Sequence, residues 1–185
     1  MDNLNKLFEE TLRDVYYAEK AILKNLPKMA KKASSDKLRS AFEEHIDQTE
    51  EQVGRLEQIF ESIGKSARGK RCPAIDGLAE EASEIMQEAE NETVRDAGML
   101  AAAQAVEHYE IARYGTLAAW ADKLGMKDAV RLLETTLEEE KETDMKLSDL
   151  ALSEINIEAD AGGAAGKSSR SASRNDAARA SERRT

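Results

Sequence analysis

The chain has few of the residues that build sheets, disulfides or rigid turns. Among its 185 residues are two prolines, one cysteine and only 4% aromatic side chains. Ala, Leu, Glu and Lys are abundant, and no strand-like alternation of useful length occurs. This composition predicts one all-α domain.

Features of secreted and membrane proteins are also missing. The single cysteine, Cys72, has no second cysteine for an intramolecular disulfide, which argues against a disulfide-stabilised secreted scaffold. The N-terminal segment is polar, without the apolar core of a signal peptide, and no later run is apolar enough to span a membrane. We therefore expect a cytoplasmic protein with no membrane partner.

Charge is divided unevenly along the chain, whose formal net charge is −10. Residues 160–185 contain six Lys or Arg and three acidic residues, so this part is +3 and the preceding part −13. An acidic body disfavours non-specific nucleic-acid binding and attracts cations. Residues 159–185 are rich in Gly, Ala, Ser and Arg without apolar periodicity, which predicts a flexible basic tail. Any contact with nucleic acid is expected through this tail.

Apolar periodicity predicts four long helices. The first covers about 4–31, the second begins at Ser34, Ser35 or Asp36 and ends at Gly64, the third begins near Glu92, and the fourth begins near Met126 after a break at Gly125. Short links make each successive pair an antiparallel hairpin. The long link between the hairpins contains a basic loop and a short amphipathic segment. This pattern predicts a ferritin-like four-helix bundle over residues 1–158, with a crossover that contains a short helix.

Metal-ligand residues interrupt each of the four apolar stripes near its middle. The first stripe runs Phe8, Leu12, Val15, Glu19, Ile22, Leu26 and Met29, so a carboxylate occupies a position that faces the core. The corresponding interruptions in the other stripes are His45, then Glu107 with Glu110, then Glu140 with Asp144. At the helical rise they lie at similar heights, about 15–18 Å from the first turn and about 18–26 Å from the second.

A buried ionised carboxylate needs a partner, because its transfer from water costs several kcal/mol when it is unpaired. None of the four stripes contains Lys or Arg. A bound cation is therefore the favoured partner. The alternative is a set of core carboxyls that share protons, bind His45 or contact buried water.

At this point the chain resembles the bacterial stress-associated, ferritin-like proteins of the YciF/YciE type. The resemblance covers about residues 4–157. It rests on Tyr17-Ala18-Glu19-Lys20, the segment 45–49, Arg95-Asp96, Ala101-Ala102-Ala103-Gln104, Glu107-His108-Tyr109-Glu110-Ile111, Tyr114-Gly115, and Leu137-Glu138-Glu139-Glu140 followed by Asp144. The resemblance implies a ferritin-like homodimer with a dimetal centre and a role in stress.

The predicted ligands differ from the broader di-iron pattern, in which two helices each carry Glu-x-x-His. Neither copy is present, so the site is rich in carboxylates and has one imidazole. The Glu107-x-x-Glu110 pair resembles the Glu-x-x-Glu of rubrerythrin-like proteins, which would terminate and bridge two metals. The predicted ligand set is Glu19, His45, Glu107, Glu110, Glu140 and Asp144. Oxygen ligands with one imidazole suit two ions of iron or manganese better than zinc.

Two functions remain open at this stage. Two redox-active ions would support a reaction with peroxide, dioxygen or ferrous iron. The missing Glu-x-x-His motifs favour instead a structural or binding protein of the stress response with a degenerate site. A homodimer is expected in either case, and apolar residues beside the stripes serve either the bundle or the interface: Ile46, Ile59, Met99, Ile111 and Trp120.

Overall fold

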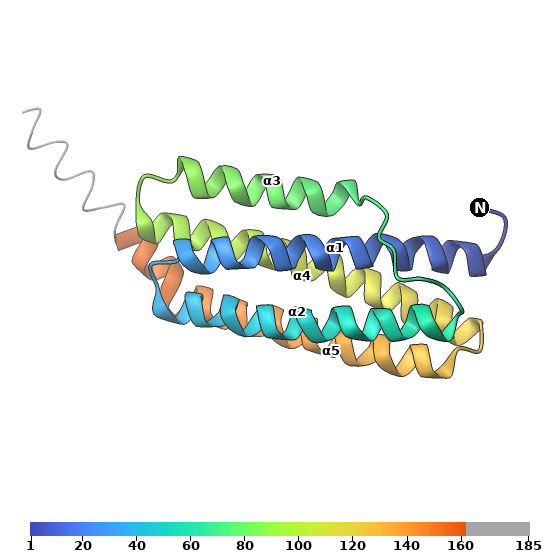
Figure 1. The fold of residues 1–185 in the computed structure, drawn as a ribbon. Coiled ribbons are helices and arrows are strands. Elements are labelled where there is room, and N and C mark those ends of the chain that lie inside the picture. Colours follow the sequence, from blue (N-terminus) through green and yellow to red (C-terminus); the bar gives the residue numbers. More distant parts are fainter. Residues whose placement is uncertain (162–185) are drawn as a thin grey trace, which may run out of the picture.

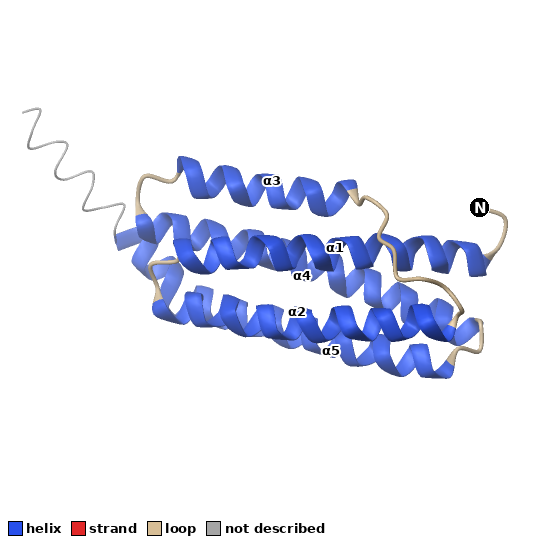
Figure 2. Cartoon of the chain, in the orientation of Figure 1, coloured by secondary structure: helices blue, strands red, loops and turns tan. Residues whose placement is uncertain are grey.

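The computed structural model describes residues 1–161. In this range the chain forms α1 (Leu4–Lys32), α2 (Asp36–Ser62), α3 (Pro73–Glu88), α4 (Glu92–Lys123), α5 (Lys127–Leu150) and η1, a π-helix (Ala151–Ile155). Residues 156–161 are again helical, and no strand occurs among residues 1–161 (Figure 2). The all-α prediction is confirmed. Beyond its first three residues, the predicted basic tail lies outside the described residues.

The long helices form a four-helix bundle made of two antiparallel hairpins. Figure 1 shows α1 and α2 as one hairpin and α4 and α5 as the other, with α1 against α4 and α2 against α5. A long crossover returns the chain to the end where α2 began, so α2 and α4 run in the same direction (Figure 1). One long crossover between two hairpins is the connectivity of ferritin-like bundles, as the sequence predicted.

Two glycines end the helices at the predicted positions. Gly64 has φ 68° and Gly125 has φ 73°, values that residues with a side chain rarely adopt. After Gly64, the Lys65 amide donates to the Phe60 carbonyl and the Gly64 amide to the Glu61 carbonyl, both at 2.9 Å. The same pair of bonds follows Gly125. This is the Schellman motif, which satisfies the last carbonyls of a helix and turns the chain away.

The crossover is fixed against α1 before α3 begins. The Lys70 amide donates to the Arg13 carbonyl at 3.0 Å, and the Arg13 side chain donates to the Arg68 carbonyl at 3.1 Å. A Cβ at Gly69 would lie 3.1 Å from the Cβ of Tyr17, so the close approach of this loop favours glycine. The α3 helix then packs outside the bundle on α1 and α4 (Figure 1).

The hydrophobic core has two parts, one toward each end of the bundle. One contains Phe42, Leu38, Met99 and their neighbours near the α1–α2 turn, with Ile75 of α3. The other contains Phe8, Phe60, Leu117, Leu133 and their neighbours near the α4–α5 turn. Between them lie the buried side chains Glu19, His45, Glu107, Glu110 and Glu140. The bundle thus carries a polar layer at mid-height.

A buried carboxylate holds the α1–α2 turn to α4. Asp96 is 2% exposed, and it accepts hydrogen bonds from the Ser34 amide at 3.0 Å, the Ser34 hydroxyl at 2.6 Å and the Ser35 amide at 2.7 Å. Ser35 is itself the N-cap of α2 and accepts from the Leu38 amide. Since amide and hydroxyl donors all converge on one charged acceptor, Asp96 joins the two hairpins at this end.

We expect Asp96→Ala to lower the free energy of unfolding by about 2–3 kcal/mol, because it leaves several donors without their charged acceptor. Urea denaturation measures this change. The matched control is Asp122→Ala at an exposed position of the same helix, where a change within about 0.5 kcal/mol is expected. Equal effects at the two sites would contradict the role assigned to Asp96.

Candidate metal centre

Four predicted ligands come together in the middle of the bundle. One ligand atom from each of His45, Glu107, Glu110 and Glu140 lies within 4.8 Å of the other three. All four side chains are buried, with exposures between 0% and 4%. They come from α2, α4 and α5, so both hairpins contribute.

Glu19 of α1 adjoins this group. Its side chain is fully buried and interacts directly with that of Glu110, as Glu107 does with Glu140. Between two ionised carboxylates such a contact is repulsive, and it becomes a hydrogen bond only when one of them holds a proton. Glu19 also accepts a hydrogen bond from the hydroxyl of Tyr114, which is buried one turn beyond Glu110. All four long helices therefore supply acidic or imidazole groups to one layer.

Burial dominates the protonation of the layer. It raises the pKa of Glu19 to about 7, against the opposing effect of the Tyr114 hydrogen bond, and that of Glu107 to about 8. It raises the pKa values of Glu110 and Glu140 well above their usual range, and the neighbouring carboxylates add to the shift. Burial also lowers the pKa of His45 to about 4, so the imidazole is neutral and able to bind a metal.

Most of the carboxylate oxygens in the layer have no hydrogen-bond donor. The six such oxygens are Oε2 of Glu19, Oε2 of Glu107, and both oxygens of Glu110 and of Glu140. The imidazole of His45 approaches Glu107 with its Nδ1 atom 3.4 Å from Oε1. Buried polar groups are almost always satisfied in native proteins, so oxygens left without a donor point to a cation or to shared protons.

The basic side chain whose charge acts on the layer is already paired with another carboxylate. The charge of Arg55 acts on Glu19, but the Arg55 guanidinium already donates to both oxygens of Glu139, at 2.5 and 2.6 Å. Such a fork-to-fork pair is a strong interaction, and the guanidinium also donates to the Thr136 hydroxyl at 3.1 Å and to Glu51 at 3.3 Å. No Lys or Arg on the four stripes is therefore available to neutralise the buried carboxylates.

Asp144 lies outside the group of four ligands. Its side chain is 20% exposed and lies 3.5 Å from Nε2 of the exposed His108. It also accepts a hydrogen bond from Gln104 Nε2 at 3.3 Å. Its charge still contributes to the raised pKa of Glu107. Asp144 therefore lies at the rim of the cluster, between the buried carboxylates and solvent.

Several side chains around the site make contacts that helical spacing does not specify. Thr49 is buried, and its hydroxyl donates to the carbonyl of His45 within α2 rather than to a ligand side chain. The bond from Tyr114 to Glu19 was not predicted, although both residues stand on inward stripes. The Arg55–Glu139 pair was also missed, because neither residue belongs to a stripe and the pairing joins helices far apart in sequence.

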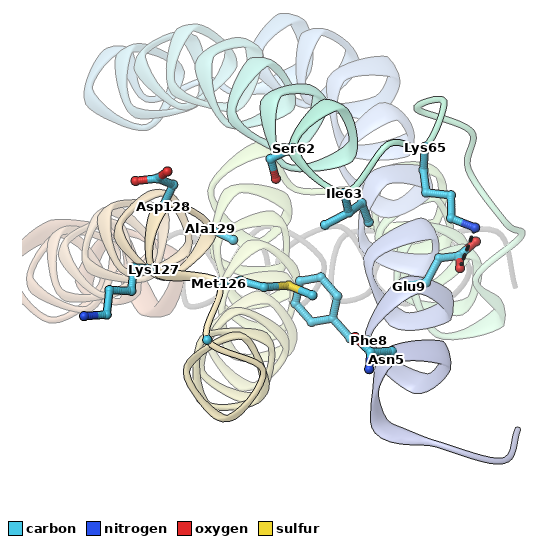
Figure 3. Close-up of a pocket in the computed structure, with 11 residues that line it drawn as sticks. Asn5, Phe8, Glu9, Ser62, Ile63, Lys65, Met126, Lys127, Asp128 and Ala129 are labelled. Atoms are coloured by element: carbon cyan, nitrogen blue, oxygen red, sulfur yellow. Dashed lines mark ion pairs between the residues drawn. The ribbon is translucent and has the colours of Figure 1, made fainter.

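One cavity of the structure lies at an end of the bundle, away from this centre. A cavity of about 580 Å³ lies at the end of the bundle where α1 begins and α4 turns into α5 (Figure 3). Phe8 and Met126 point toward one another there, and Lys65 pairs with Glu9 at 3.3 Å. Phe8 precedes Glu19 by eleven residues, about 16 Å at the helical rise. This cavity is therefore separate from the carboxylate layer.

Comparison with known proteins assigns the chain to a family. Residues 3–160 match the family described as a domain of unknown function, DUF892, and the chain belongs to that family. It is 45% identical over 161 residues to Protein YciF of Escherichia coli strain K12, a match that spans 86% of this chain and 97% of YciF. This confirms the resemblance seen in the sequence.

Solved structures share the fold. The crystal structure of the E. coli stress protein YciF matches with a TM-score of 0.81 at 46% identity, over 84% of this chain and 99% of that one. YcfI of Rhodopseudomonas palustris matches with a TM-score of 0.78 at 49% identity, over 80% and 94% of the two chains. A Xanthomonas campestris protein, 20% identical over 80% and 91%, has a TM-score of 0.63 and shares the fold. No described helix of the present chain has the length and apolarity needed to cross a membrane.

The raised carboxyl pKa values predict how pH changes the stability of the metal-free protein. A group whose pKa is higher in the folded state stabilises the fold below its unfolded value, here 4.5, and loses that effect as pH rises through the folded value, about 7 for Glu19 and about 8 for Glu107. The lowered pKa of His45 acts in the opposite direction, but four carboxyls outweigh one imidazole. We expect stability to fall by about 1 kcal/mol or more per pH unit between pH 5 and 7.

Denaturation of chelator-treated protein at several pH values measures this slope. Glu110→Gln should reduce the slope and stabilise the metal-free protein above pH 7, because it replaces a buried carboxyl by a neutral amide. The control, Glu138→Gln, changes an exposed carboxyl of α5 and should leave the slope unchanged. A wild-type stability that is flat or rises over this interval would contradict the effect of burial.

Proposed function

We propose that the carboxylate layer binds two ions of iron or manganese and that the protein acts in the stress response through this centre. The observation that carries the proposal is the set of six buried carboxylate oxygens without a donor, beside four ligand atoms that lie within 4.8 Å of one another. Metal cations relieve the mutual repulsion of these carboxylates and supply the missing partners. The relative YciF is described as a stress protein, which supports the physiological part of the proposal.

The donor set fits iron or manganese. Carboxylate oxygens with one neutral imidazole suit these divalent ions, whereas zinc prefers sets richer in cysteine and histidine. Glu107 and Glu110 stand one turn apart on α4 and would each present a carboxylate to the centre. Glu140 faces them from α5, and His45 would supply the single nitrogen ligand.

The surrounding side chains would position these ligands. The Tyr114 hydroxyl donates to Oε1 of Glu19, which leaves Oε2 of Glu19 without a donor. A donor on one oxygen fixes the orientation of a ligand carboxylate. We assign Asp144 to the rim, where it contacts Gln104 and His108 and adds negative charge near Glu107.

When bound, two such ions would supply two electrons, enough to reduce dioxygen and two protons to hydrogen peroxide, or hydrogen peroxide and two protons to two waters. The buried residues of this chain would exclude bulk water from that reaction. Tyr114 would keep its proton, because burial raises its pKa well above the ordinary value and neighbouring carboxylates add to the shift. Ferrous iron is the other substrate class that the oxygen-rich ligand set suits.

A non-catalytic function is the second candidate. The layer has a single histidine, and its carboxyls can share protons in the pairs Glu19–Glu110 and Glu107–Glu140. YcfI of Rhodopseudomonas palustris carries the provisional description of a structural protein, which agrees with this alternative. In that case the layer would be a polar core held by protons or by a passive ion.

Elemental analysis separates the two candidates. We expect about two iron or manganese ions per chain in untagged protein after anaerobic loading, as in two-metal sites generally. Glu107→Gln and Glu140→Gln should each remove most of the metal while the fold is retained, because each deletes a buried carboxylate ligand.

The matched control for these variants is Glu138→Gln, an exposed position two residues from Glu140, which should bind as much metal as the wild type. Wild-type protein that stays empty after loading with either metal would refute the dimetal proposal. Retention of full metal content in both ligand variants would assign the metal to another place.

We also propose that two chains associate. Ile59 and Met99, which the sequence left open for an interface, are 1% and 0% exposed in the core of one chain and serve the bundle instead. Large apolar side chains are exposed elsewhere, near the start of α4 and around the end of α5: Val94, Met145, Leu152 and Ile157, at 43–75%. Because these two helix ends are antiparallel neighbours, the exposed side chains support an interface at this end of the bundle.

Light scattering tests this association. Leu152→Glu should halve the measured mass by placing a charge in an apolar contact, while metal content stays the same. Ser153→Glu, at the neighbouring exposed position, is the control and should leave the mass unchanged. A monomeric wild type would refute the homodimer.

A further inference from the structure

A small apolar recess adjoins the metal centre. It has a volume of about 40 Å³, and His45 and Glu107 form part of its lining. The remaining walls come from three helices: Ile22, Leu26 and Met29 of α1, Ile75 of α3, and Ala103 of α4. We call this space the apolar recess.

The apolar recess extends from the buried layer toward the protein surface. His45 and Glu107 are 4% and 2% exposed, whereas Asn25, Ala79 and Val106 of the lining are half-buried. Ala79 belongs to α3, so the crossover helix closes one side of the recess. The Asn25 side-chain oxygen is occupied at the outer end, where it accepts a hydrogen bond from Lys28 at 3.0 Å.

The chemistry of the recess selects what can occupy it. A space of about 10–15 Å³ already holds one water molecule, so the recess is large enough for a diatomic gas, but a water needs two to four polar partners. Its walls are otherwise apolar between Asn25 at the outer end and His45 with Glu107 at the inner end. Hydrogen peroxide would lose its hydrogen bonds there at a cost of about 2 kcal/mol or more, and a hydrated ferrous ion would lose far more.

We propose that the apolar recess binds dioxygen and is its route to the centre formed by His45, Glu107, Glu110 and Glu140. The inference rests on the proposed metal centre and selects one of its substrate classes. Dioxygen is small and apolar, so it loses little on leaving water and gains dispersion contacts with the aliphatic walls. Peroxide and ferrous iron would need a polar route, for which the rim at Asp144 and His108 has suitable groups.

Xenon tests the recess without any metal, because dry apolar cavities bind it. Crystals of the full chain pressurised with xenon should show an anomalous peak between Ile22, Ala79 and Ala103. Ala79→Leu should abolish the peak by filling the recess from α3. Ala74→Leu places the same side chain on an exposed part of α3 and should retain the peak.

Oxidation rates then connect the recess with the centre. In ferrous-loaded protein, Ala79→Leu should slow oxidation by dioxygen about tenfold or more, as closure of a gate does. Oxidation by hydrogen peroxide and the metal content should stay at the wild-type level. Ala103→Val narrows the recess from α4 and should act in the same direction, so the test does not depend on one variant.

The outcomes separate the two proposals. Metal uptake without xenon in the recess, or a normal dioxygen rate in Ala79→Leu protein that has lost the xenon peak, would overturn the dioxygen route and leave the metal centre standing. Equal slowing with dioxygen and peroxide would also overturn it. A xenon peak in protein that takes up no metal would refute the metal centre and, with it, the dioxygen route.

Discussion

The buried acidic layer is the constraint on which the rest of the molecule depends. Four carboxyls and one imidazole lie between two apolar clusters, where an unpaired charge costs several kcal/mol. The protein can satisfy the layer with protons or with cations, and each choice has a different consequence. Protons would keep the metal-free fold stable at low pH, whereas bound cations would give partners to oxygens that lack donors. The proposed function corresponds to satisfying the layer with cations.

The connectivity of the bundle brings residues of both hairpins into this layer. Gly64 and Gly125 end their helices sharply, and the crossover returns the chain so that α4 begins beside the α1–α2 turn. Asp96 then joins α4 to that turn. With the ends fixed, Glu19, Glu107 and Glu110 reach the same height as His45 and Glu140. The crossover contains helix α3, which lines one side of the apolar recess. The connection that sets the order of the helices therefore also contributes to the proposed path toward the centre.

The surroundings of the centre differ in polarity between the apolar recess and the rim at Asp144. Apolar walls lead from α3 toward His45 and Glu107, whereas Asp144 and His108 form a polar rim at the edge of the cluster. A metal centre reached through the apolar recess would distinguish a gas from a hydrophilic oxidant by the free energy of leaving water.

The sequence by itself determined the helices, their ends and most of the polar layer. Apolar spacing of three and four is a local property, as are glycine stops, so the stripes containing Glu19, His45, Glu107, Glu110 and Glu140 were visible without the fold. Only the tertiary structure decided that Asp144 lies at the rim, that Tyr114 donates to Glu19, that Arg55 is held by Glu139, and that residues of four helices line a recess. These features depend on rotation and distance between helices far apart in the chain. Helical periodicity specifies which face of one helix is buried, but not which side chain of another helix it meets.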